Sequence, residues 1–165
     1  MKNKLFTLVA ITVFTFFHCK EKMNHHMGDM ANDPHLTENN ITKLVKADDL
    51  HIAFDFMSMP YHMQMMKLMN AQMQYDAEAT HGLMVTVMNY QTKKILNDAK
   101  VTLKITTPDG KISQHETEIM HGAGMHHYAI HLNAKEQGLY VIHAQIFYKG
   151  KEYLAKTDFE LKPEK

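Results

Sequence analysis

The stretch "LYVIHAQIFY" (residues 139–148), with the "KGK" (149–151) and "EYLAKTDFEL" (152–161) that follow it, decides the fold. Apolar and polar residues alternate along both longer segments, and this period of two is typical of a half-buried β-strand. The short connection with its glycine is typical of a tight turn between neighbouring strands. The C-terminal part of the chain therefore predicts paired strands that bury one face.

Similar short segments, alternating or rich in β-branched and aromatic residues, recur through the preceding ninety or so residues. They are "LHIAFDFM" (50–57), "LMVTVMNY" (83–90), "KVTLKITT" (100–107), "KISQHETEI" (111–119) and "HHYAIHL" (126–132). Turn residues such as the "PDG" at 108–110 separate them. Six or seven short strands joined by turns predict an all-β fold, an immunoglobulin-like antiparallel β-sandwich. Closure into a small barrel is the alternative.

One segment between the first two predicted strands has a different period. Pro60 can open a helix at its first turn, and after it His62, Met66, Met69 and Met73 recur at helical spacing. We expect a short Met-rich helical segment over residues 59–75. Its stripe of methionines is either a packing face or a set of soft sulfur donors for Cu(I), and the sequence leaves both possibilities open.

The N-terminus resembles the signal of a bacterial lipoprotein. Lys2 and Lys4 precede an apolar run, "LFTLVAITVFTFF" (5–17), which is too short to span a bilayer comfortably. Cys19 follows at the position where such a protein is cleaved and lipidated. We therefore expect a signal peptide over residues 1–18 and a lipid anchor at Cys19. A flexible tether over residues 19–49 and a β-sandwich domain over residues 50–165 complete the expected organisation.

Composition and charge argue against several classes of function. The 165 residues carry no formal net charge and show no basic stripe, which argues against nucleic-acid binding. Lipidation would consume Cys19, the only cysteine, so a disulfide, a cysteine zinc cage and a blue-copper centre are not expected. The sequence shows no catalytic nucleophile next to a general base at a suitable spacing, so the chain is not expected to be an enzyme.

The N-terminal signal also predicts where the protein is located. We expect a location in the cell envelope, on the periplasmic side or at the outer membrane.

The 15 methionines and 13 histidines are concentrated at a few places, one of which is the turn "MHGAGMHH" (120–127). The candidate metal ligands at this turn are Met120, His121, Met125, His126 and His127, and its two glycines allow the ends to approach each other. His81 and His143 are candidates to complete the site. Imidazole and thioether without carboxylate favour copper, Cu(I) above all, over zinc. The tether carries a second group of such donors in "MNHHMGDM" (23–30).

Residues 80–162 resemble a known group of periplasmic proteins. Met120 is followed seven residues later by His127-Tyr128, and a strand and turn of the pattern D-A-x-V to P-D-G extend from Asp98 to Gly110. These elements are similar to YtkA-like domains and, more distantly, to P19-type proteins associated with copper-assisted iron uptake. The resemblance implies an immunoglobulin-like fold and a copper site with Met120 and His127 as ligands. The chain lacks the acidic stretches of the P19 type, which argues against iron uptake.

Two hypotheses of function follow. The first is an extracytoplasmic copper-binding lipoprotein that buffers, delivers or detoxifies Cu(I), with a metal ion and a protein that exchanges copper as its partners. The alternative is a non-catalytic structural or protein-interaction lipoprotein that presents its Met-rich face to a partner. The first requires the methionine stripe and the histidines of the turn to converge in space. The second requires an exposed apolar patch far from those histidines.

Overall fold

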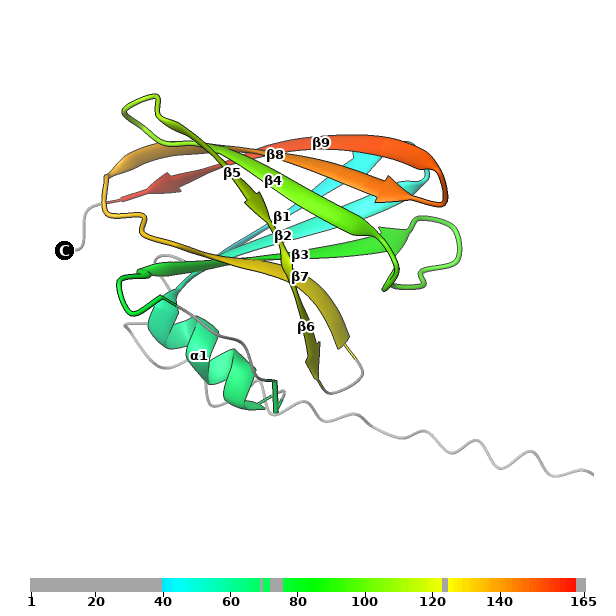
Figure 1. Cartoon of the computed structure of the whole chain (residues 1–165), viewed down its shortest axis with the longest axis horizontal. Coiled ribbons are helices and arrows are strands. Elements are labelled where there is room, and N and C mark those ends of the chain that lie inside the picture. Colours follow the sequence, from blue (N-terminus) through cyan, green and yellow to red (C-terminus); the bar gives the residue numbers. More distant parts are fainter. Residues whose placement is uncertain (1–39, 69, 72–75, 123–124, 163–165) are drawn as a thin grey trace, which may run out of the picture.

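The computed structural model describes residues 40–68, 70–71, 76–122 and 125–162, which form two antiparallel β-sheets and one helix (Figure 1). The first sheet has the strand order β1 (Ile41–Ala47), β2 (Leu50–Ser58), β3 (His81–Asn89), β7 (Met125–Leu132) and β6 (Glu118–Gly122). The second has the order β5 (Ile112–Glu116), β4 (Lys100–Thr106), β8 (Gly138–Tyr148) and β9 (Lys151–Leu161). Helix α1 (Met59–Leu68) lies on the side of the first sheet that faces away from the second.

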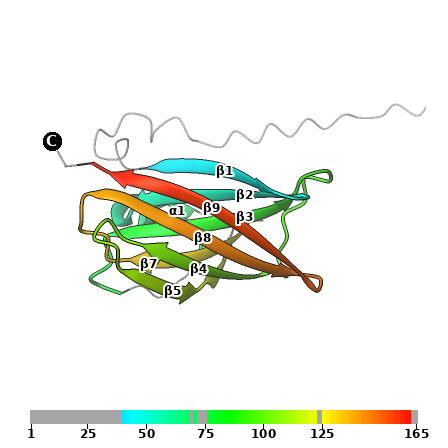
Figure 2. The same ribbon diagram turned by 90° about the horizontal axis from the view of Figure 1, so that it is seen from above.

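The main core fills the space between the two sheets, which lie one over the other in the view from above (Figure 2). Alternate residues of each strand point into it, so Phe54 and Phe56 of β2 are fully buried, as are Ile142 and Phe159 of the opposing sheet. Burying one such side chain stabilises the fold by about 1.5–3 kcal/mol. The predicted all-β sandwich with one short helix is confirmed.

The β8–β9 hairpin is the one that the sequence predicted. Tyr148 pairs with Lys151, and the two residues between them, Lys149 and Gly150, both have positive φ angles, of 48° and 77°. Two such residues in succession match the right-handed twist of the flanking strands, and glycine at the second position removes the steric cost. The long, uninterrupted pairing of β8 with β9 follows from this turn.

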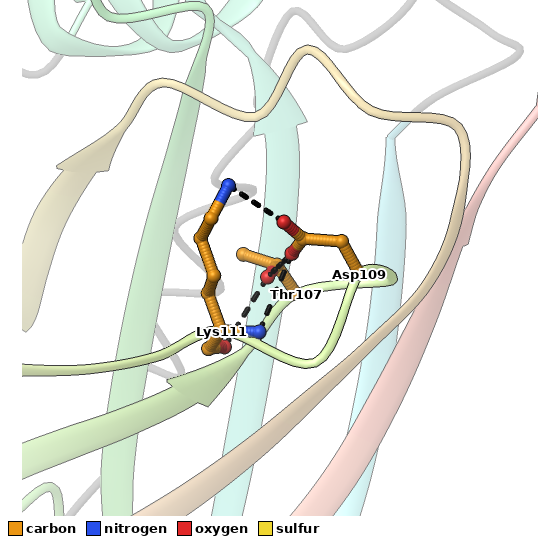
Figure 3. A network of polar contacts seen from close by, with 3 residues as sticks. All are labelled: Thr107, Asp109 and Lys111. Atoms are coloured by element: carbon orange, nitrogen blue, oxygen red, sulfur yellow. Dashed lines mark hydrogen bonds and ion pairs between the residues drawn. The ribbon is translucent and has the colours of Figure 1, made fainter.

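A polar network closes the hairpin between β4 and β5, where the sequence has "PDG" (Figure 3). The carboxylate of Asp109 accepts hydrogen bonds from the Thr107 hydroxyl and the Lys111 ammonium, the latter at 2.6 Å. The bond to Lys111, followed by that to Thr107, holds the pKa of Asp109 well below its ordinary value. The network thus fixes a turn in which Gly110 takes a φ of 84°.

Strand β1 corrects the predicted boundary of the tether. Ile41–Ala47 pairs along its whole length with β2, so residues 41–47 belong to the sandwich and not to the tether expected over residues 19–49. The strand lies at the sheet edge, and its alternate residues are only half-buried. Because its inward positions include Lys43 beside Ile41 and Val45, the alternation of apolar residues is weak and the sequence pattern missed it.

The predicted strand over residues 111–119 is in fact two strands. Thr117 separates β5, in the second sheet, from β6, in the first. The Thr117 hydroxyl donates to the carbonyl of Val101 at 2.9 Å and so fixes the chain at the crossing. Alternation continues across this point, which is why periodicity alone indicated a single strand. The crossing brings Met120 to the edge of the first sheet.

Helix α1 is shorter than the predicted segment 59–75. It ends at Leu68, and Asn70 then takes a positive φ of 50° while the Ala71 amide donates to the carbonyl of Met66 at 2.9 Å. Asparagine tolerates this left-handed conformation and ends helices for that reason. The prediction that Met69 and Met73 continue the helical stripe falls on positions outside the described residues.

The predicted signal peptide over residues 1–18, Cys19 and the donors at 23–30 also lie outside the described residues, which begin at Asn40. In the part of the chain that the structure describes, no helix is long and apolar enough to cross a membrane.

Tyr128 ties β7 to the loop before β4, and we expect Tyr128→Phe to cost about 1–3 kcal/mol of the free energy of unfolding. Its buried hydroxyl donates to the carbonyl of Leu96 at 3.1 Å and accepts from the amide of Ala99 at 3.0 Å. The substitution leaves both backbone groups without their partner. Urea denaturation measures the loss. Tyr90→Phe, at a tyrosine that is 41% exposed, is the control and should change little; equal effects of the two variants would contradict this account.

Candidate metal centre

Four methionines come together beneath helix α1, on the outer face of the first sheet. We call Met57, Met66, Met84 and Met120 the methionine cluster. They come from β2, α1, β3 and β6, and all are buried, with Met120 at 0% exposure. Tyr61 and Met65 of the helix pack against the cluster from its rim. Thioethers from four elements thus occupy one small buried volume, separate from the main core.

Strand register explains why these side chains meet. Met120 of β6 lies directly opposite His127 of β7, so both point to the same face of the sheet. Met84 of β3 lies opposite Ala129 of β7 on one side and opposite Asp55 of β2 on the other. Because Ala129 is small, it leaves room above the sheet that the longer methionines fill.

His127 is the imidazole of this face that belongs to the turn singled out in the sequence. Its Nδ1 lies 2.7 Å from the hydroxyl oxygen of Thr86, and the residue is 9% exposed. When Nδ1–H donates to that hydroxyl, Nε2 presents its lone pair and the ring orientation is fixed, as for metal-binding histidines in general. Burial lowers the pKa of His127, while the nearby Asp55 carboxylate opposes this shift. The neutral imidazole that a metal requires is therefore favoured.

A cavity connects this face with the surface. Its volume is about 270 Å³, and its walls include Asp55 and Tyr61 as well as Met57, Met84 and His127. Carboxylate and hydroxyl groups thus stand beside thioethers and an imidazole. An ion that enters this cavity meets two members of the methionine cluster and His127.

A second pair of imidazoles lies beside the methionine cluster. His62 of α1 is fully buried, and its Nε2 lies 3.1 Å from the Nε2 of His131 of β7. The ring of His62 rests directly on Gly82 of β3, where a Cβ atom would lie 2.6 Å from its Nδ1. That Nδ1 is buried and has no hydrogen-bond partner. The helix is therefore docked on the sheet through an imidazole that only a glycine beneath it can accommodate.

We expect the buried state of His62 to make the protein less stable in acid. Burial, reinforced by His131 and then His127, lowers the pKa of His62 from 6.5 to about 4. As the pH falls below 6.5, His62 is protonated in the unfolded chain, whereas in the folded chain it stays neutral until about pH 4. The free energy of unfolding therefore decreases with falling pH across this window, by up to about 3 kcal/mol.

Urea denaturation at several pH values between 7 and 4 measures this effect. The variant His62→Gln, which cannot take up the proton, should show a flatter pH profile than the parent chain. His143→Gln, at an exposed histidine on the other sheet, should keep the parent profile. The same slope in the parent and in His62→Gln would show that other groups cause the acid sensitivity.

Four of the other predicted ligands, all histidines, do not join Met120 and His127. His121 and His126 pair with each other across the β6–β7 hairpin, with their Nδ1 atoms 3.1 Å apart, on the opposite face of these strands. His81 stacks on Phe56 on the core side of the first sheet, with ring centroids 4.9 Å apart. His143 is exposed on the second sheet. Met125 pairs with Gly122 in register, but its side chain lies outside the described atoms.

Met57 and Met84 belong to the candidate site, although the sequence pattern did not single them out as ligands. Among the described residues, no group of three His, Cys, Asp or Glu side chains is placed to hold a metal ion. A metal at the methionine cluster would therefore need thioether ligands, of which Met57 and Met84 come from predicted strands. Both point away from the main core, and a methionine at an outward position of a strand is the signal that could have found them.

Comparisons with known proteins agree with the fold. No protein-family profile matches the chain, and no curated protein is similar to it in sequence. A DUF4426 family protein from Pseudomonas aeruginosa is similar in structure, with a TM-score of 0.60 and 14% identity over 75% of this chain and 97% of that one. A copper-bound variant of FetP from uropathogenic Escherichia coli gives 0.55 and 9%, over 74% and 96% of the two chains. FetP as isolated after expression in the periplasm gives 0.53 and 9%, over 76% and 97%. These proteins share the sandwich fold with this chain.

Proposed function

We propose that this protein is an extracytoplasmic copper-binding protein that buffers, delivers or detoxifies Cu(I). The observation that carries the proposal is the convergence of Met66, from the helical stripe, with Met120, from the turn, in one buried cluster. His127 lies opposite Met120 and next to the same cavity as Met57 and Met84. The proposed ligands are Met120 and His127, with Met57 and Met84 within the same site.

The chemistry of this donor set favours Cu(I) over other ions. Thioether sulfur is a soft, neutral ligand that suits Cu(I) and binds zinc or iron poorly. A site at this depth also penalises charge, so a single positive charge costs less to bury than two. The Asp55 carboxylate at the cavity wall partly offsets that single charge. No thiolate is needed, which suits a protein outside the reducing cytoplasm.

The alternative function, a Met-rich surface for a protein partner, is less well supported by the geometry. It requires exposed methionines far from the histidines, whereas the four members of the methionine cluster are at most 8% exposed. The fold likeness to FetP, of which a copper-bound structure exists, adds support for metal handling. Lipidation at Cys19, a place in the cell envelope and a protein that exchanges copper with this one are parts of the same proposal.

The proposal is tested by competition between the protein and a colorimetric Cu(I) chelator, with Zn(II) titrated in parallel. To remove the thiol of Cys19 and the donors of residues 23–30, the full chain carries C19S with M23L, H25Q, H26Q, M27L and M30L, and we call this chain the tail variant. We expect the tail variant to take one equivalent of Cu(I) from the chelator and to keep it in excess Zn(II). Cu(I) binding no tighter than that of a short histidine-rich peptide would contradict the proposal.

A further inference from the structure

We propose that His62 and His131 form a second metal site, separate from the methionine cluster, which binds a borderline divalent cation such as Zn(II) through their two Nε2 atoms. This site uses neither Met120 nor His127, so it does not depend on the copper function proposed above. Zn(II) suits two imidazoles because nitrogen donors bind it well without any sulfur. The two histidines come from α1 and β7, which are far apart in the sequence.

The distance between the two nitrogens fits one bound ion. Zinc binds imidazole nitrogen at about 2.0–2.1 Å, so two nitrogens on one tetrahedral zinc lie about 3.3 Å apart. In this structure the Nε2 atoms of His62 and His131 share a hydrogen bond at 3.1 Å, and a bound ion would take the place of that hydrogen bond. Their rings meet edge to face at 84°, with centroids 4.9 Å apart, so they do not stack and a small displacement admits the ion.

The surroundings of His62 fix the position of its imidazole ring. The side chain is fully buried, and its second nitrogen has no hydrogen-bond partner. That nitrogen, Nδ1, faces Gly82, whereas Nε2 is the atom directed at His131. Gly82 leaves just enough space for the ring above the sheet, so neither the helix nor the imidazole can move far. Because burial lowers its pKa, His62 stays neutral at physiological pH and can offer a lone pair.

A polar cavity gives a cation access to His131. The cavity, of about 230 Å³, is lined by His131, by His115 and by the carboxylates of Asp76, Glu116 and Glu118. Lys100 forms an ion pair with Glu116 at 3.3 Å, which leaves a net negative charge on the lining. Carboxylates at this place attract a cation, and water from the cavity can complete its coordination. This cavity differs from the one that reaches Met57 and Met84.

An ion at this position would join helix α1 to β7 across Gly82. The helix covers the methionine cluster. A divalent cation would therefore hold α1 in place over the proposed copper site without sharing the ligands of that site. Zn(II) binding should then raise the melting temperature of the protein, because an ion that binds only the folded chain stabilises it.

The test is a Zn(II) titration of the tail variant by competition with a fluorescent zinc chelator, with the melting temperature measured in parallel. We expect one equivalent of Zn(II), bound at least about tenfold more weakly after His131→Gln or His62→Gln, since even residues behind the ligands alter metal affinity by about 10- to 100-fold. His131 is half-buried, so His131→Gln provides a folded variant if His62→Gln destabilises the chain. His143→Gln should leave Zn(II) affinity unchanged.

Two results would overturn this proposal. The first is unchanged Zn(II) affinity in His131→Gln. The second is an equal loss of Zn(II) affinity when Met120 and His127 are replaced instead, because a single shared site would then explain the binding. Loss of Cu(I) binding is measured separately in the Met120 and His127 variants, so failure of the copper function and failure of this site give different results.

Discussion

Replacing Met120 by leucine and His127 by glutamine should weaken Cu(I) binding by the tail variant at least about 100-fold. Each substitution removes one proposed ligand, and removing even a residue that only supports a ligand costs about 10- to 100-fold in metal affinity. Leucine has nearly the volume of methionine, so the packing beneath helix α1 is kept and the loss reports the sulfur atom. The measurement is Cu(I) competition with the same chelator as for the parent.

Met63→Leu and His143→Gln provide the matched control. Both change the same two residue types at exposed positions, one on the outer side of α1 and one on the second sheet. Combined in the tail variant, they should leave Cu(I) affinity within a few-fold of the parent. If this control and the Met120 and His127 variant lost affinity equally, binding would be a property of composition and the buried cluster would not be the site.

Replacing Gly82 by alanine should destabilise the protein by about 3 kcal/mol, at the upper end of what overpacking costs. The new methyl group would lie 2.6 Å from Nδ1 and 2.7 Å from Cγ of His62. Because Cγ is close to the helix backbone, the ring cannot simply turn aside, and α1 must shift as a whole. The φ of Gly82 lies outside the left-handed region that glycine favours, so the entire cost is steric. Urea denaturation measures it.

Gly110→Ala is the control for the glycine substitution itself. A Cβ at Gly110 meets nothing within 4 Å, but φ there is 84°, so only the backbone cost of about 1–2 kcal/mol is expected. The double variant Gly82→Ala with His62→Ala removes the clash, and its cost should be smaller than the sum of the two single costs. Strict additivity would show that His62 does not rest on Gly82 as described.

Most of the fold could be predicted because the strands bury a single face. Alternation in β8 and β9 is almost perfect, so their pairing and their turn were evident from the sequence. The edge strand β1 was missed because half-buried inward positions tolerate lysine, which removes the contrast on which periodicity depends. The crossing at Thr117 was missed for the opposite reason, since alternation does not change when a strand passes from one sheet to the other.

The metal centre was predictable only in part. Met120 and His127 share one pair of adjacent strands, and parity correctly placed His127 on the face opposite Tyr128. Their other neighbours depend on which strands adjoin β7 and on where α1 folds back, and the sequence pattern specifies neither. For this reason the sequence pattern indicated only that His62 belongs to the helical stripe of methionines. Its contact with His131 follows from the way the helix packs over Gly82.

The same reasoning explains why His81 and His143 do not join the site. Each lies in a strand, and each was a plausible ligand as long as the arrangement of the sheets was unknown. His81 turned out to face the core, where Phe56 covers it, and His143 belongs to the other sheet. In a sandwich, the sheet and the face on which a residue lies determine how far it is from a site. Periodicity predicts the face but does not predict the sheet.

X-ray absorption at the copper edge, on the tail variant loaded with one equivalent of Cu(I), tests the central claim most directly. The copper site described above predicts a first shell with at least two sulfur atoms and one imidazole nitrogen. The sulfur contribution should fall when Met120 is replaced by leucine. A first shell of nitrogen and oxygen alone, unchanged by that substitution, would contradict the assignment of the methionine cluster and His127 as the copper site.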